Sequence, residues 1–112
     1  MASITNVINS SQPLHGYLTT VDTESLSGPG AVPITSAIVE LTTTGADALT
    51  LADGAEGQHI FIVMITDGGD GTLTPANFGS GTTITFDDAG DAAHLLFTNG
   101  AWYYLGGAAT VA

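Results

Sequence analysis

The sequence contains no lysine and no arginine, although it has eleven aspartate and glutamate residues, so its formal net charge is −11. Protein surfaces normally mix charges of both signs, and this chain cannot form a single Lys or Arg salt bridge. Its negative field repels phosphate groups, nucleic acids and anionic lipids. The charge therefore argues against nucleic-acid partners and favours a partner with a basic patch.

The sequence also has no cysteine, which excludes disulfides and thiolate metal sites. Residues 1–6 lack a basic segment followed by an apolar one, so we expect no secretory signal. The longest apolar run, residues 60–65, is far too short to span a bilayer as a helix, and no membrane partner is predicted. No long window shows the apolar spacing of an amphipathic helix without a break at Gly or Pro.

What the sequence does contain favours an all-β domain. Its 112 residues suit one modest core, 44% of them are hydrophobic, and seventeen threonines accompany fifteen glycines. The β-rich runs occupy residues 32–41, 47–52, 58–66, 82–86, 92–98 and 101–105. This spacing predicts a sandwich or jelly-roll-like barrel of about seven short antiparallel strands.

The chain is predicted to divide into an N-terminal arm, residues 1–31, and a β-sandwich body, residues 32–112. The boundary is placed at Ser27-Gly28-Pro29-Gly30, a cluster typical of a joint. Within the arm, residues 17–21 have the pattern of an edge strand. A flexible tail and an ordered arm that reaches across to a neighbouring subunit both remain open.

The run 58–66 is apolar on both of its faces. Alternation places Ile60, Ile62 and Met64 on one face and His59, Phe61, Val63 and Ile65 on the other. Such a strand must be covered on both sides. We expect it to be central in a sandwich or to pack against another subunit.

Residues 92–105 have the pattern of a hairpin closed by a two-residue type I′ turn at Asn99-Gly100. That turn predicts which residues face one another: Phe97 and Trp102, Leu95 and Tyr104, Leu96 and Tyr103, His94 and Leu105. The aromatic run Trp102-Tyr103-Tyr104 is also typical of a sugar-binding platform. The opposed Phe97 and Leu96 favour hairpin core instead.

No residues combine into a catalytic site. His15, His59 and His94 have no second histidine or acid at metal-ligand spacing, so a zinc site would need convergence from distant positions. No serine lies in a Gly-x-Ser-x-Gly elbow, and no cation is present to stabilise a transition state. We predict no catalytic, cofactor-binding or metal-binding residues, no cofactor and no enzymatic activity.

Seven of the eleven acids fall in three glycine-rich turns: Asp53 and Glu56; Asp67 and Asp70; Asp87, Asp88 and Asp91. Residues 67–71 resemble a calcium loop but lack its series of oxygen ligands and its closing glutamate. The favoured interpretation is that these acids form turns and keep the surface soluble. If the strands run up and down in order, the 67–71 and 87–91 turns share an end, where five acids would offer an alternative calcium site.

Several segments taken together carry a resemblance to a known group of proteins. They are residues 41–58 with the apolar strand that follows, 71–77, 82–86, 90–92 and 99–102. Across about residues 28–107, the chain resembles small virion structural proteins of tailed bacteriophages, especially marine ones. In these proteins, similar β modules recur in capsid decoration proteins and fibres, and the family has no catalytic residues.

The resemblance implies a non-enzymatic capsid decoration, or cement, protein. Such a protein lies on the outer capsid surface of the virion, binds the major capsid protein and forms a homotrimer that stabilises the shell. The alternatives are a trimeric head-fibre or tail-fibre module and a carbohydrate-binding β-domain. Fibre modules come from long multidomain chains, whereas this chain starts at its own Met1 and ends just after its last strand, which favours a free-standing decoration protein.

Overall fold

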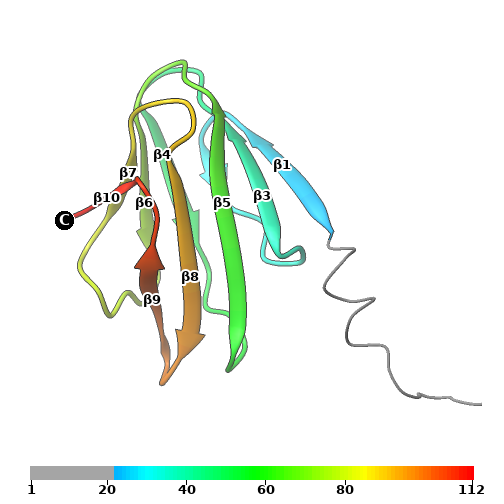
Figure 1. Cartoon of the computed structure of the whole chain (residues 1–112), viewed down its shortest axis with the longest axis vertical. Helices are drawn as coiled ribbons and strands as arrows, with labels where there is room; N and C mark the ends of the chain where they lie inside the picture. The colour runs from blue at the N-terminus through cyan, green and yellow to red at the C-terminus, as the bar shows by residue number, and fades with distance from the viewer. Residues whose placement is uncertain (1–21) are drawn as a thin grey trace, which may run out of the picture.

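The structure is a computed structural model that describes residues 22–112, so most of the predicted arm, including His15 and the 17–21 run, lies outside the described residues. Two five-stranded sheets pack face to face (Figure 1). The strands are β1 (Thr23–Ser27), β2 (Gly30–Ala31), β3 (Ile38–Thr42), β4 (Asp47–Leu51), β5 (Gln58–Thr66), β6 (Gly71–Pro75), β7 (Ile84–Phe86), β8 (Ala92–Thr98), β9 (Ala101–Gly106) and β10 (Thr110–Val111). The predicted all-β sandwich is confirmed.

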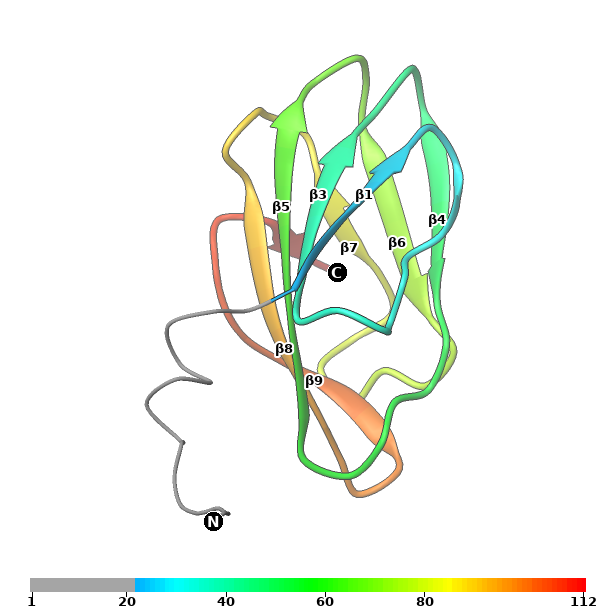
Figure 2. The ribbon, with the colours of Figure 1, turned by 90° about the vertical axis from the view of Figure 1, so that its right-hand side faces the viewer.

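The first sheet has the order β1-β3-β5-β8-β9 and the second has the order β10-β7-β6-β4-β2. From β1 to β6 the chain alternates between the two sheets, so β1, β3 and β5 are parallel neighbours, as are β2, β4 and β6. The remaining pairs are antiparallel. Figure 2 shows the two layers from the side.

The number and direction of the strands therefore differ from the prediction of about seven antiparallel ones. Turn residues indicate where a chain changes direction, but not which of two sheets the next strand joins. Strand β6, with Leu73 buried between exposed threonines, was not predicted, and neither was the short β10. Residues 32–37, predicted as part of a strand, form the connection into β3 instead.

The predicted boundary between arm and body at residue 31 is also wrong. Strand β1 pairs with β3 along its whole length, and β2 pairs with β4, so the sandwich includes residues 23–31. The Gly-Pro-Gly segment is a tight passage from one sheet to the other, in which Gly28 and Gly30 adopt φ angles of 77° and 141°. Glycine is the residue that adopts such angles without strain, both at joints and inside compact turns.

The core lies between the sheets and follows strict alternation along the strands. In β5, Ile60, Ile62 and Met64 are fully buried, and β3, β4, β6 and β7 add further buried aliphatic and aromatic side chains. Strand β5 is central in its sheet, between β3 and β8, as one of the two alternatives expected. Its other face is not covered by any of residues 22–112.

The predicted hairpin is confirmed in its turn and in most of its register. Asn99 and Gly100 both have positive φ angles, 54° and 79°, as a type I′ turn requires. Phe97 pairs with Trp102, Leu96 with Tyr103 and Leu95 with Tyr104. His94 pairs with Gly106 rather than with Leu105, because a bulge between His94 and Leu95 shifts the register by one residue.

The hairpin supplies the largest side chain of the core. Trp102 is fully buried, its indole N–H donates to the carbonyl of Ala52 at 2.9 Å, and its ring meets Phe97 edge-on with centroids 5.2 Å apart. We predict that Trp102→Ala lowers the free energy of unfolding by about 3–5 kcal/mol, because it leaves a cavity and an unpaired carbonyl. Urea denaturation measures this change.

Thr74→Ala, at an exposed position of β6, is the control and is expected to cost less than about 1 kcal/mol. Equal effects of the two substitutions would show that Trp102 does not stabilise the core.

Candidate functional site

The outer faces of the two sheets differ in chemistry. Among residues 22–112, the large hydrophobic side chains that are exposed are Phe61 (41%), Ile65 (52%) and Leu105 (52%), and all three lie on the outer face of the first sheet. The outer face of the second sheet instead exposes threonines: Thr50, Thr72, Thr74 and Thr110. Only the first sheet therefore has the surface of a contact site.

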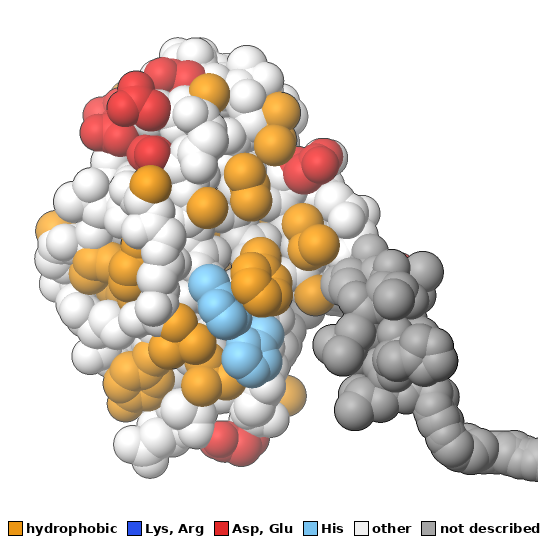
Figure 3. All heavy atoms as spheres, in the orientation of Figure 1, with side chains coloured by type: hydrophobic (Ala, Val, Ile, Leu, Met, Phe, Trp, Pro, Cys, Tyr) orange, Lys and Arg blue, Asp and Glu red, His pale blue; other side chains and the backbone are white. Residues whose placement is uncertain are grey.

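We call this surface the apolar face. It consists of the outward side chains of β3, β5, β8 and β9: Ile38, Phe61, Val63, Ile65, Leu96, Tyr103 and Leu105, together with His59 and His94. Figure 3 shows the two histidines side by side among hydrophobic side chains. Glu40 of β3, whose backbone pairs with Val63, is the acid on the same outward side.

His59 and His94 form a close pair on the apolar face. Nδ1 of His59 lies 2.8 Å from Nε2 of His94, within hydrogen-bond distance, and the ring centroids are 5.1 Å apart with planes inclined by 28°. The two nitrogens thus point toward each other, so one ring donates its N–H to the other. Such a bond needs one proton between the two nitrogens, and it is lost if both rings become imidazolium.

The position of His94 is fixed from its other side by Phe61. The two rings stack with centroids 4.1 Å apart and planes inclined by 14°. Phe61 lies directly opposite His94 in the antiparallel pairing of β5 with β8. Partial burial lowers the pKa of His94 below its ordinary value of 6.5, and the neighbouring His59 lowers the pKa further.

Sequence reasoning missed this pair because the two histidines are 35 residues apart. Neither has a metal-ligand neighbour nearby in the sequence, and the pairing of β5 with β8 is what brings them together. The signal in the sequence that could have revealed the pair is the position of both histidines within apolar strands. With antiparallel pairing in this register, Phe61 lies opposite His94, and His59 is the diagonal neighbour of His94.

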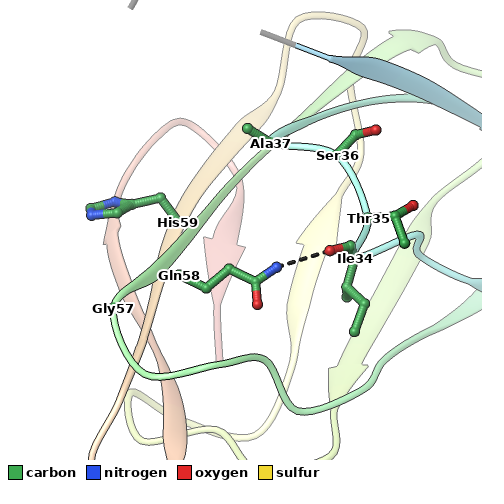
Figure 4. A pocket seen from close by; sticks show the side chains of 7 residues that line it. All are labelled: Ile34, Thr35, Ser36, Ala37, Gly57, Gln58 and His59. Carbon is green, nitrogen blue, oxygen red and sulfur yellow. Dashed lines mark hydrogen bonds between the residues drawn. The ribbon is translucent and has the colours of Figure 1, made fainter. Parts of the chain in front are cut away.

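A shallow pocket adjoins the pair. It has a volume of about 250 Å³ and is lined by residues 34–37 and by Gly57, Gln58 and His59. Figure 4 shows the Gln58 amide donating to the carbonyl of Ile34 at 2.9 Å, while the His59 ring points away from the other lining residues. Among the lining side chains, Thr35 donates to Glu24 and Gln58 is held by the chain, and His59 is the titratable one.

The predicted meeting of the acidic turns occurs in part. The 67–71 and 87–91 turns lie at one end of the sandwich, where Figure 3 shows a cluster of acidic side chains. Asp70 is close enough for its charge to raise the pKa of Asp87, although the main cause is the hydrogen bond of Asp87 with Asp91. Within residues 22–112, however, no three acidic or histidine side chains are placed to hold a metal ion.

The acids in these turns accept hydrogen bonds from the chain itself. Oδ2 of Asp91 accepts from the backbone N–H groups of Asp87 and Asp88 at 3.0 and 3.2 Å, and the bond from Asp87 is the main cause that lowers the pKa of Asp91. Oδ1 of Asp67 accepts from Gly69 at 3.0 Å. Their arrangement supports the favoured interpretation of turn-forming acids rather than the calcium alternative.

Two of the three residues in the aromatic run, Trp102 and Tyr104, face the inside of the sandwich. Trp102 is fully buried, and the Tyr104 hydroxyl donates toward the carbonyls of Gly107 and Ala109 at 2.6 and 3.0 Å. Burial raises the pKa of Tyr104, and the charge of Asp91 adds to this effect. Of the three aromatic residues, only Tyr103 points to the outer face.

Comparison with known protein families and with curated proteins finds no match to this chain. Within the described part of the chain, no helix has the length and apolar character needed to cross a membrane.

The histidine pair makes the folding stability depend on pH. Because folding lowers the pKa of His94, the unfolded chain binds more protons as the pH falls through about 6.5, and the folded state loses stability there. We predict that wild-type protein loses more thermal stability than His94→Gln when the pH falls from about 7.5 to about 5.5.

The matched control is His15→Gln, which removes the third histidine and should keep the wild-type slope. The thermal stabilities are compared between variants because lowering the pH also reduces the repulsion among the eleven carboxylates, which all variants share. If the thermal stability of wild type and of His94→Gln changed equally with pH, His94 would not be the source of the pH dependence.

Proposed function

We propose that the protein is a non-enzymatic structural protein that decorates the outer surface of a bacteriophage capsid as a homotrimer. The observation that carries the proposal is the contrast between the two sheets. The second sheet exposes threonines to solvent, whereas the first exposes Phe61, Ile65 and Leu105. Hydrophobic side chains gathered on one exposed face are typical of a surface that contacts a partner. The family resemblance supplies the trimer and the capsid.

The occupant of the apolar face in this proposal is a second copy of the chain. The copies repel one another, since each carries a charge of −11. This repulsion is smallest when the copies meet through a surface that is poor in acids. On the apolar face, Glu40 is the acid among the outward side chains, while most described acids lie in turns at the ends of the sandwich. Hydrophobic burial on this face then drives the assembly.

The partner of the acidic ends is the major capsid protein. A chain without lysine or arginine supplies only negative charge to a polar contact, so the complementary surface on the shell is basic. Among the rival functions, carbohydrate binding loses its main support because Trp102 is buried. No described feature favours an enzyme.

The trimer is tested by the mass in solution. We expect light scattering to give three times the chain mass for wild type at micromolar concentration, and a monomer mass for Ile65→Glu, which places a charge on the apolar face. Thr74→Glu adds the same charge to the outer face of the second sheet and should stay trimeric. A monomer mass for the wild type would contradict the assembly.

The two proposed contacts have opposite salt dependence. Salt screens the repulsion between like-charged copies and should strengthen the trimer, whereas it screens the attraction to a basic shell and should slow attachment. Rates of binding to undecorated shells, measured over a range of salt concentrations, check this.

The role of the arm is tested by measuring how a chain that lacks residues 2–21 and keeps β1 binds to undecorated shells. If the arm reaches a neighbouring capsomer, this variant attaches more weakly than the full chain. Equal attachment at every salt concentration would show that the sandwich alone binds the shell.

A further inference from the structure

We propose that His59 and His94 form a two-ligand site for a divalent transition-metal ion of the zinc, nickel and copper class. Nδ1 of His59 and Nε2 of His94 are the two ligand atoms. The site belongs to the single chain and does not depend on the proposed function. Imidazole is the ligand that these metals share, and neutral histidine is their commonest protein ligand.

The spacing of the two rings fits such an ion. Two imidazole nitrogens bound to one tetrahedral zinc ion at about 2.0–2.1 Å stand about 3.3 Å apart. In the structure the same two nitrogens are 2.8 Å apart and point toward one another. Small rotations about the side-chain bonds, which open this distance by about half an ångström, would turn both nitrogens toward a common ion.

The backbone holds the two ligands in place before any ion binds. Both histidines lie within long strands that pair continuously from Gln58 to Val63 and from Ala92 to Phe97. Phe61, stacked on His94, limits the orientation of that ring. Ligands that are held in place in this way lose little conformational entropy on binding, which raises the affinity.

Protons compete with the ion for the same nitrogens. In the pair as it stands, one of the two facing nitrogens carries a proton, which must move to the other nitrogen of its ring when the ion binds. Near neutral pH this is a change of tautomer with no net release of protons. In acid, imidazolium forms and the affinity should fall.

The coordination is open on its remaining sides. Within residues 22–112, no third acid or histidine joins the pair, so water completes the coordination in the single chain. The nitrogen ligands of the pair differ from the carboxylate oxygens at the acidic end of the sandwich, which suit hard ions such as calcium. Competition between metals therefore distinguishes the two locations.

The test is titration of the full chain with zinc chloride at about pH 7.5, followed by calorimetry. We expect one zinc ion per chain and a loss of affinity of about 10–100-fold in either His59→Gln or His94→Gln, because removing one ligand removes the gain from two linked ones. His15→Gln and Asp88→Asn are the matched controls and should bind zinc as the wild type does. Millimolar calcium should not compete.

A second measurement needs no variant at the site. Nitrogen NMR of the histidine rings should show zinc-induced shifts at Nδ1 of one ring and at Nε2 of another. Repeating the titration on Ile65→Glu, with and without each histidine substitution, separates this inference from the assembly. Zinc binding by Ile65→Glu but not by the wild type would support the site and show that a second copy covers it. Zinc affinity that neither histidine substitution lowers in Ile65→Glu, or displacement of zinc by calcium, would overturn the proposal.

Discussion

The pairing of β5 with β8 is the contact on which the rest of the structure depends. Strand β5 is the last of the three parallel strands of the first sheet, and β8 begins the hairpin, so their antiparallel ladder joins the two halves of that sheet. On its inner side the ladder aligns Ile60 and Ile62 with Leu95 and Ala93 in the core. On its outer side the same register brings Phe61 and His59 to His94. Core and candidate site are thus two faces of one ladder.

A chain without cations must satisfy its acids by other means. Several of the described carboxylates accept hydrogen bonds from backbone N–H groups, hydroxyls and amides. Asp47 accepts from the Thr44 N–H at 2.9 Å, and Asp53 accepts from the Asn77 amide at 2.9 and 3.0 Å. Glu56 accepts from the Thr98 hydroxyl and, at 3.1 Å, from the Asn99 N–H. Hydrogen bonds to a carboxylate are stronger than neutral ones, so the acids stabilise turns and tie them to the hairpin.

This use of the acids leaves the outer faces of the sheets to decide what the protein can contact. Threonine suits a solvated β surface because it is both β-branched and polar. Exposed Phe61, Ile65 and Leu105 do not suit such a surface, and they gather on one sheet only. The same face carries the two imidazoles, the only described side chains that become cationic when they bind a proton. Proton or metal binding at this pair would therefore act within the surface proposed for assembly.

The sequence by itself determined the local features. The absence of helical periodicity established the all-β class, Asn99-Gly100 specified the hairpin turn, and alternation separated the two faces of β5. These features depend on a few adjacent residues, where backbone geometry and period-two alternation leave little choice. Only the tertiary structure decided that the first six strands alternate between two sheets, that Thr23–Ser27 belongs to the sandwich, and that His59 meets His94. Each of these depends on pairing between distant strands, which is selected by burial in the complete core rather than by any local signal.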